Sequence, residues 1–509
     1  KETIFISTNA ETELFNQAFH FHSKGNILKA SKCYQSCINQ GSKNHMVFYN
    51  YGILLQDIGK LKEAAEITHR AIELKPDYAN AYVNLGSIMK DLGQFKEAEI
   101  HTRKAIQLKP DLANAYYNLG TILSISNLDR LKEAEIHTRK SIELQPDLAN
   151  AHYNLGIISN ALGDPYKAIK AFKEAIKYSP TYLDAIFNLG STLINIRKKE
   201  EGKKYLEKIL ALQCKDIDKD LINLKKVQKQ AIYKLIHCLF HEGDFESTKI
   251  LLNKIPENEF NHSYKIACLL GLDKAKAFQS EYKVISNKNL CNSLIGSAID
   301  HANIIYKEKF NSTFCNEAIN YIIHKNLKEE EFPNRICDLL ISMIHQNSNK
   351  EKVRNGINDI SKTKGNLFSL EYPFIKELKS LIENQINNYR FHFRDSQEGF
   401  ILNWPREYKL GGWLINTRAG GLLKPHMHES SWISGSFYLK VPKTNDNEGN
   451  IAFNPKGPLY PDKEKIFPEK ILNISSRDIC IFPSSLFHYT IPFNSTEERI
   501  CFVFDLMPK

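Results

Sequence analysis

The stretch NLGSIMKDLGQFKEAEIHTRKAIQLKPDLANAY, which runs from Asn84 to Tyr116, recurs with small changes along the first half of the chain. Glycine lets two helices approach closely and proline ends a helix, so each copy is predicted to form a helical hairpin. One hairpin cannot bury its apolar face alone, so neighbouring copies must stack. The repeated glycines are Gly52, Gly86, Gly120, Gly156 and Gly190, and the closing prolines are Pro76, Pro110, Pro146 and Pro180.

The copies resemble the tetratricopeptide repeat in their length, their Leu-Gly pair, their Ala residues and their final Pro. The resemblance covers about residues 12–218. It implies a right-handed superhelix with a concave inner surface that binds a protein or peptide. We therefore place a repeat array at residues 1–218, with degraded first and last copies that act as caps.

An asparagine lies two residues before each repeat glycine, so stacking would align these side chains as a ladder. An amide both donates and accepts hydrogen bonds, which suits it to an extended peptide backbone. A similar ladder binds peptide backbones in the O-linked N-acetylglucosamine transferases. The alternative is that each asparagine bonds within its own repeat. The residues are Asn50, Asn84, Asn118, Asn154 and Asn188, and we assign the last four to substrate binding.

Composition narrows the classes of partner. The net charge of +10 is spread along 509 residues, without the basic stripe of a nucleic-acid-binding protein. No apolar run approaches the roughly 20 residues that a membrane-spanning helix requires. The ten cysteines are dispersed and include no CxxC pair, which is typical of reduced thiols. We therefore expect a cytoplasmic protein that binds neither nucleic acid nor membrane.

Residues 219–364 keep helical spacing of apolar residues but lose the regular repeat, so an irregular helical bridge is expected. His237 and His241 are four residues apart on a predicted helix, which is a spacing found in zinc sites. No acidic or cysteine partner accompanies them in a recognisable motif. We therefore interpret them as ordinary packed or surface histidines.

From residue 365 to residue 509, short apolar-polar alternations replace the helical pattern, which predicts a β domain preceded by a helix. Residues i and i+2 of a strand face the same way, so His426 and His428 should point into one space. By the same alternation Ser436 and Tyr438 should line a cavity. A turn at Asn494 and Ser495 would fold the next segment into a hairpin and bring Arg499 close to His488.

The HMH motif, the run FPSSLFH and the arginine eleven residues later resemble the Fe(II)/2-oxoglutarate oxygenases, the double-stranded β-helix superfamily that includes prolyl hydroxylases. The resemblance covers about residues 365–509. It implies a jelly-roll domain in which His426 and His488 hold Fe(II), and we assign His428, which follows one residue after His426, as the third ligand. It further implies that Arg499 holds the distal carboxylate of 2-oxoglutarate, with Tyr438 and Ser436 beside it. A permanently charged, bidentate arginine suits a buried carboxylate.

One residue departs from the superfamily pattern, because His428 stands where an Asp or Glu is usual. Three neutral imidazoles can still hold Fe(II) on one face of the ion. Two alternatives stay open: His428 supports the site from outside the metal's ligand shell, or Glu429 reaches the metal through a bulge. Strand alternation argues against Glu429, since it should face away.

The fold class predicted is thus multidomain: a tetratricopeptide superhelix, an irregular helical region and a C-terminal double-stranded β-helix. The function predicted is an iron- and 2-oxoglutarate-dependent dioxygenase that uses O₂ to hydroxylate a polypeptide, with succinate and CO₂ as co-products. One alternative is a non-catalytic peptide-binding scaffold. The other is a three-histidine dioxygenase that needs no 2-oxoglutarate, although Arg499 argues against it. Asp505 ends the inward-facing row of Arg499, Cys501 and Val503 and is a candidate substrate contact.

Overall fold

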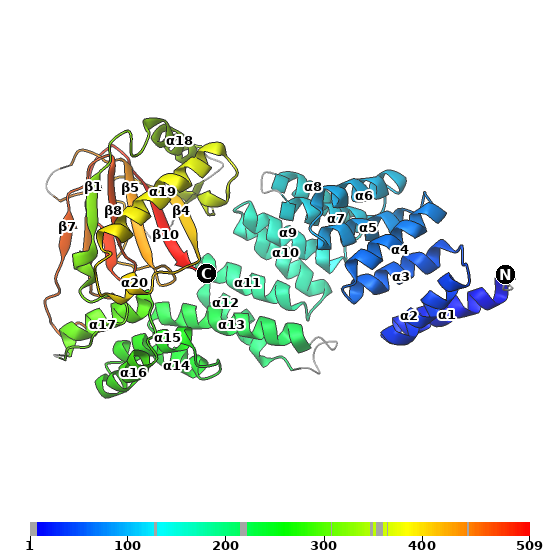
Figure 1. Cartoon of the computed structure of the whole chain (residues 1–509), viewed down its shortest axis with the longest axis horizontal. Coiled ribbons are helices and arrows are strands. Elements are labelled where there is room, and N and C mark those ends of the chain that lie inside the picture. The colour runs from blue at the N-terminus through cyan, green and yellow to red at the C-terminus, as the bar shows by residue number, and fades with distance from the viewer. Residues whose placement is uncertain are drawn as a thin grey trace. The chain divides into compact units, whose positions relative to one another are not determined.

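The computed structural model describes residues 8–126, 130–213, 221–306, 308–346, 350–352, 360–363, 365–444 and 447–509. The chain divides into two compact units, Lys1–Ala231 and Ile232–Lys509 (Figure 1). No helix among the described residues combines the length and the apolar character needed to cross a bilayer. None of the described cysteines forms a disulfide.

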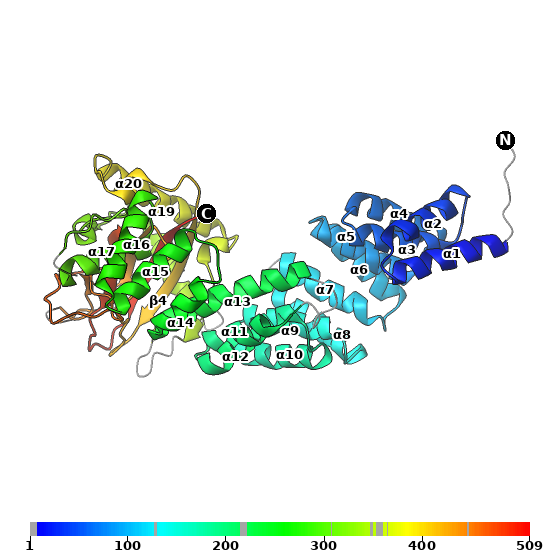
Figure 2. The ribbon, with the colours of Figure 1, turned by 90° about the horizontal axis from the view of Figure 1, so that it is seen from below.

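The first unit is a series of helical hairpins that follow one another in chain order (Figure 2). Each helix packs on its hairpin partner and on the next helix of the array. The helices are α1 (Thr8–Ser23), α2 (Ile27–Asn39), α3 (His45–Asp57), α4 (Leu61–Leu74), α5 (Ala79–Asp91), α6 (Phe95–Leu108), α7 (Ala113–Ser126), α8 (Leu131–Leu144), α9 (Ala149–Ala161), α10 (Pro165–Tyr178), α11 (Leu183–Asn195) and α12 (Lys199–Ala211).

The repeat glycines lie where the two helices of a hairpin cross. A Cβ atom on Gly86 would stand 2.3 Å from Thr102 Oγ1, and one on Gly120 would stand 2.2 Å from Thr138 Oγ1. Real Cβ atoms do not approach an oxygen so closely, so only glycine lets these helices pack at this distance. The predicted role of the glycine is therefore confirmed.

The second unit begins with helices, and further helices lie between its first strands in the chain. Asparagine side chains cap two of them, because Asn258 accepts from the backbone N–H of Asn261 and Asn292 accepts from that of Ile295. The helices are α13 (Leu221–Glu242), which begins in the first unit, α14 (Phe245–Leu252), α15 (Glu259–Gly271), α16 (Ala275–Asn287), α17 (Ser293–Ile305), α18 (Asn334–His345), α19 (Pro373–His392) and α20 (Gly399–Leu402), with 3₁₀ turns at Ala318–Tyr321 and Leu367–Ser369.

The strands form two sheets, as expected for a jelly roll. The larger sheet has the order β1-β8-β5-β10-β4-β3-β2, and the smaller has the order β7-β6-β9. Three of these strands, β1 to β3, come from the segment that was expected to be a helical bridge. The strands are β1 (Ile323–Asn326), β2 (Lys350–Lys352), β3 (Ile360–Thr363), β4 (Tyr408–Thr417), β5 (Ile433–Lys440), β6 (Ile451–Asn454), β7 (Lys470–Leu472), β8 (Asp478–Pro483), β9 (Phe487–Thr490) and β10 (Arg499–Pro508).

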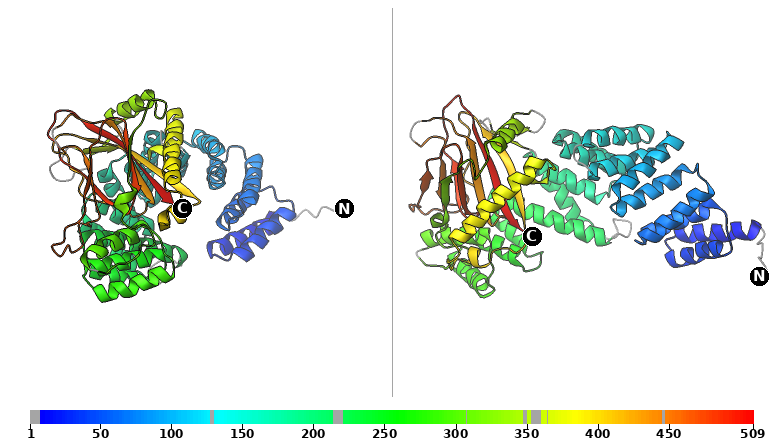
Figure 3. Two further views of the ribbon diagram at one scale, coloured as in Figure 1. Left: turned by 60° about the vertical axis from the view of Figure 1, so that its left-hand side comes forward. Right: turned by 45° about the horizontal axis from the view of Figure 1, so that its top comes forward.

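The larger sheet buries both faces. On one face α18 and α19 share its apolar core, and Phe437 of β5 stacks on Phe332 with ring centroids 4.0 Å apart. On the other face Phe482 of β8 meets Phe453 of the smaller sheet at 4.8 Å. Figure 3 shows the orange and red strands beside the green helices of the same unit. The predicted fold class, helical repeats followed by a jelly-roll domain, is confirmed.

Candidate active site

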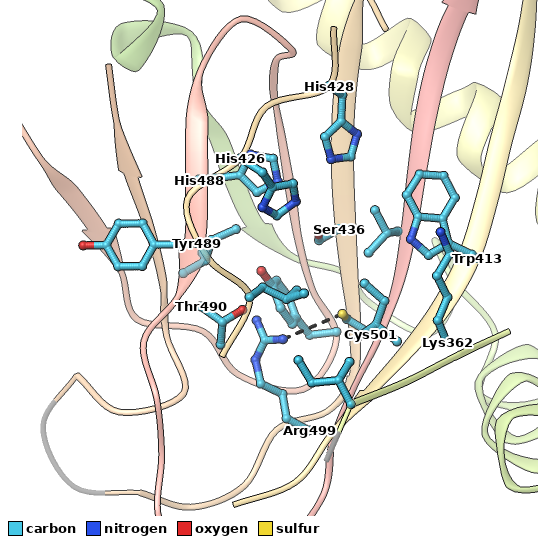
Figure 4. Close-up of a pocket in the computed structure, with 16 residues that line it drawn as sticks. Lys362, Trp413, His426, His428, Ser436, His488, Tyr489, Thr490, Arg499 and Cys501 are labelled. Atoms are coloured by element: carbon cyan, nitrogen blue, oxygen red, sulfur yellow. Dashed lines mark hydrogen bonds between the residues drawn. The ribbon is translucent and has the colours of Figure 1, made fainter. Parts of the chain in front are cut away.

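Three histidine side chains meet in a cavity of the jelly roll. The ring centroids of His426 and His488 lie 4.4 Å apart, and that of His428 lies 5.4 Å from the first and 5.2 Å from the second. A nitrogen atom from each ring lies within 4.8 Å of those from the other two. Figure 4 shows all three rings turned toward one space. Tertiary structure thus brings together the three histidines that the sequence singled out.

Backbone hydrogen bonds hold two of these residues side by side. The N–H of His426 donates to the carbonyl of His488 at 3.1 Å, and the N–H of His488 donates to the carbonyl of His426 at 2.9 Å. This pair is an isolated bridge, because His426 and His428 lie in an irregular extended segment before β5. The regular strand predicted for them was wrong, although their rings do face one space. This single bridge, and not a longer run of paired strand residues, holds His426 next to His488.

Hydrogen bonds at Nδ1 decide which nitrogen of each ring faces the cavity. Carbonyl and carboxylate oxygens only accept, so each Nδ1 carries the proton and each Nε2 keeps its lone pair. Three Nε2 lone pairs are the donor set that a transition metal needs from imidazole. The acceptors are the carbonyl of Lys424 for His426 at 2.8 Å, the carbonyl of Leu486 for His488 at 3.3 Å, and the carboxylate of Asp505 for His428 at 2.7 Å.

Asp505 of β10 is the functional residue whose role the sequence did not predict. Its carboxylate accepts from His428 Nδ1 through both oxygens, and Oδ1 also accepts from the Ser434 hydroxyl at 2.6 Å. The idea that Asp505 contacts substrate was wrong, because its carboxylate is buried behind the His428 ring. The alternation of Arg499, Cys501, Val503 and Asp505 along the sequence indicated that the Asp505 side chain faces inward. Only the hydrogen bonds in the folded domain show that Asp505 contacts His428.

Burial keeps the imidazoles of His426 and His488 neutral. It lowers the pKa of His488 well below the ordinary value, and the neighbouring His426 and His428 rings lower it further. Burial, with the His428 ring as the next cause, lowers the pKa of His426 to about 4. Neutral imidazole is the form that coordinates a metal, so at neutral pH these two ligands need not lose a proton first.

Arg499 enters the same cavity from the start of β10, and Figure 4 shows it below the histidines. Its side chain is 2 % exposed, and its guanidinium lies 4.9 Å from the Tyr438 ring centroid. Nε donates to the Gly449 carbonyl at 2.9 Å, and Nη1 lies 3.8 Å from the sulfur of Cys501. No carboxylate of the described residues pairs with it, so this buried cation lacks a counter-charge.

The predicted hairpin around Asn494 was wrong. β10, which carries Arg499, pairs with β4 and β5 in the larger sheet, whereas β9, which carries His488, pairs with β6 in the smaller one. Arg499 and His488 therefore face each other across the cavity from opposite sheets. Sequence spacing placed them near each other for an incorrect reason.

Ser436 and Tyr438 line the cavity, which has a volume of about 310 Å³. The Tyr438 hydroxyl lies close to the Ser436 side chain but completes no hydrogen bond among the described residues. Burial raises its pKa well above the ordinary value, so it stays protonated and can donate. Among the described residues the Tyr438 hydroxyl has no acceptor and the Arg499 guanidinium has no carboxylate partner, and both groups suit an anionic ligand.

Comparison with known proteins agrees with this geometry. Residues 411–505 match the family model described as "Putative 2OG-Fe(II) oxygenase". Residues 79–112, 113–148, 149–182 and 183–213 match models of the tetratricopeptide repeat. The chain joins tetratricopeptide repeats to a domain of the 2OG-Fe(II) oxygenase family. None of the curated proteins matches this chain.

Solved structures resemble parts of the chain. The tetratricopeptide protein YrrB is 24% identical, with a TM-score of 0.28, over 39% of this chain and 100% of its own. A tetratricopeptide repeat protein from Parabacteroides merdae ATCC 43184 is 16% identical, with a TM-score of 0.37, over 51% of this chain and 99% of its own. Likenesses at these scores say nothing of function.

The asparagines of the tetratricopeptide array donate hydrogen bonds within the array. Asn84, Asn118 and Asn154 donate to the preceding repeat, and Asn188 donates within its own repeat, so the alternative of a bond within the same repeat is supported for Asn188 alone. Asn84 and Asn154 Nδ2 donate to Thr68 and Thr138 Oγ1 at 3.3 and 3.2 Å, Asn118 Nδ2 donates to the Val83 carbonyl at 3.3 Å, and Asn188 Nδ2 donates to the Asp184 carbonyl at 2.9 Å.

Glu429 of the oxygenase domain does not reach the histidine cavity. Its carboxylate instead contacts the Tyr264 hydroxyl at 2.6 Å and His241 Nε2 at 3.1 Å, both on the helical side of the same unit. The alternative in which Glu429 replaces the usual acidic ligand therefore has no geometric support. The pairing also corrects the expectation that His237 and His241 lack an acidic neighbour, since Glu429 belongs to one ligand group with both.

Proposed function

We propose that this protein is an Fe(II)- and 2-oxoglutarate-dependent dioxygenase that hydroxylates a polypeptide. One observation carries the proposal: three imidazole Nε2 lone pairs share one cavity with a buried guanidinium that meets no carboxylate of the described residues. The three imidazoles suit a metal ion, and the guanidinium suits the distal carboxylate of 2-oxoglutarate. The match to the oxygenase family supports the same pairing.

His426, His428 and His488 would hold Fe(II) from one side. Three protein ligands leave further positions of an octahedral ion open for cosubstrate and O₂. Asp505 orients the ring of His428 and fixes its tautomer, as carboxylates do behind metal-bound histidines. Trp413 stacks near the same ring at 6.0 Å and restricts its rotation.

Arg499 would bind the distal carboxylate of 2-oxoglutarate, with Tyr438 donating a hydrogen bond and Ser436 beside it. When bound, iron and 2-oxoglutarate supply the oxidising chemistry: one O₂ oxygen enters the substrate as hydroxyl, and the other enters succinate as CO₂ leaves. Apolar side chains around the cavity, among them Ile415, Ile451 and Val503, exclude water from this chemistry.

The tetratricopeptide array would hold the substrate polypeptide, because helical repeats of this class present extended binding surfaces. The ladder of Asn84, Asn118, Asn154 and Asn188 is our proposed contact to its backbone. The absence of disulfides among the described cysteines suits the reducing cytoplasm, which we propose as the location.

The test is succinate release with oxygen gain. The full chain is incubated with Fe(II), 2-oxoglutarate, O₂ and a host lysate depleted of small molecules, and peptides that gain one oxygen are sought by mass spectrometry. Iron-dependent succinate release together with oxidised peptides supports the proposal. Absence of succinate release with iron bound would indicate a non-catalytic scaffold. Oxidation unaffected by 2-oxoglutarate would indicate the cosubstrate-independent dioxygenase.

A further inference from the structure

A second group of metal-ligating side chains lies outside the histidine cavity. His237 and His241 are one turn apart on α13, and their ring centroids lie 4.4 Å apart. Glu429 joins them from the turn that follows His428. One ligand atom from each of the three residues lies within 4.8 Å of the other two. Two imidazoles and a carboxylate are an established donor set for divalent transition metals.

The distances leave room for an ion without rebuilding the backbone. His241 Nε2 and Glu429 Oε1 are 3.1 Å apart. With metal bonds of about 2.0–2.1 Å, two ligands of a tetrahedral ion stand roughly 3.3 Å apart. Both histidines are exposed, so small changes of side-chain torsion can close the remaining gap to His237. Their exposure also leaves a path by which the ion can enter.

The carboxylate is held in place before any ion binds. Oε2 of Glu429 accepts from the Tyr264 hydroxyl at 2.6 Å, and the Tyr264 ring packs between Phe240 at 5.0 Å and Phe260 at 4.6 Å. The backbone is fixed as well, because the Ser293 hydroxyl contacts the Glu429 carbonyl at 2.8 Å. Carboxylates that bind metals are themselves hydrogen-bonded, and here a buried tyrosine fixes one oxygen of Glu429 and leaves the other toward His241.

We propose that His237, His241 and Glu429 bind a second divalent cation of the Zn²⁺ class, with water in the fourth position. The ion would tie α13 to the turn that carries His428, and so couple the helical region of this unit to the oxygenase site. The side chains of Glu429 and His428 point to different spaces, so the two sites can load separately. The inference does not depend on the proposed hydroxylase activity.

Metal stoichiometry tests the proposal. The full-length chain, without an affinity tag, is dialysed against Zn²⁺ at neutral pH and bound metal is measured by atomic emission. We expect two equivalents for the wild type. The doubly substituted variant His237→Ala, His241→Ala should retain one equivalent. The reciprocal variant His426→Ala, His488→Ala should also retain one equivalent. That equivalent should be lost when His237→Ala and His241→Ala are added to it.

Two substitutions probe the geometry, and a third pair serves as control. Glu429→Gln should weaken the second equivalent by more than tenfold, and Tyr264→Phe should weaken it by about 10–100-fold, as for other residues behind metal ligands. His69→Ala with His101→Ala removes a ring pair, 5.8 Å apart, that belongs to no three-ligand group of the described residues, and should change nothing.

Two results would overturn the proposal. One is a single equivalent in the wild type that the His237→Ala, His241→Ala variant keeps at the same affinity. The other is equal loss of metal in that variant and in the His69→Ala, His101→Ala control, which would indicate nonspecific surface binding. If the His426→Ala, His488→Ala variant does not fold, the comparison of the wild type with His237→Ala, His241→Ala still decides the question.

Discussion

Replacing Arg499 should abolish tight cosubstrate binding while leaving the metal site intact. The guanidinium is 2 % exposed and meets no carboxylate of the described residues, so a bound dianion would be its counter-charge. Removing one partner of a buried ion pair costs about 3–5 kcal/mol. At about 1.4 kcal/mol per tenfold, Arg499→Ala should weaken the binding of 2-oxoglutarate by roughly 10²- to 4 × 10³-fold. Arg499→Lys keeps the charge but loses the bidentate fork, so a loss of about tenfold is expected.

The assay measures two affinities separately. Under nitrogen, Mn²⁺ serves as a redox-silent substitute for iron, and calorimetry gives first the metal affinity and then the 2-oxoglutarate affinity of the metal-loaded chain. Thermal unfolding gives an independent reading. Ligand at 100 times its dissociation constant stabilises the wild type by about 2.7 kcal/mol. The same concentration should stabilise a variant weakened 100-fold by only about 0.4 kcal/mol.

Arg499→Met is the folding control, because it keeps the length of the side chain and removes a buried charge that lacks a counter-charge. Its ligand-free unfolding free energy should not fall below that of Arg499→Ala. The reasoning is refuted if Arg499→Ala binds 2-oxoglutarate within threefold of the wild type. It is equally refuted if the metal affinity falls as much as the cosubstrate affinity.

Three further predictions address other parts of the chain. His428→Ala should weaken Mn²⁺ strongly and Asp505→Asn by about 10–100-fold, and unchanged titrations would remove both from the metal site. Changing Asn118 and Asn154 together to Ala should preserve succinate release without substrate but lower the yield of oxidised peptide; equal yields would exclude the ladder. Burial raises the pKa of Asp300 to about 7, so ionisation costs the folded state stability as the pH rises from about 4 through 7. Asp300→Asn should therefore stabilise the chain against urea at pH 8 by up to about 4 kcal/mol more than at pH 4, and equal effects would contradict this.

Short-range patterns were the most reliable source of prediction. The glycine of each repeat contacts a residue sixteen or eighteen positions later, as Gly86 does with Thr102, so a recurrent spacing encodes the hairpin directly. These contacts depend on local geometry, which the order of residues expresses without knowledge of the rest of the chain.

Long-range pairing was predicted less well. The hairpin predicted between His488 and Arg499 was wrong because β9 and β10 belong to different sheets. The turn residues between two strands do not indicate whether those strands pair with each other. The partner of His428 lies 77 residues away at Asp505. Glu429 lies far along the chain from His237 and His241, so the residues around these histidines could not indicate that a carboxylate is close to them.

By itself, the sequence determined the helical repeat, the change to a β domain and the three imidazoles with one guanidinium that define the candidate site. Tertiary structure alone decided which ring nitrogen faces the cavity, which carboxylate orients His428 and where Glu429 points. The reason is physical: period and residue type fix which elements form, whereas hydrogen-bond partners across sheets depend on strand order and register. Those are set by how the whole core packs.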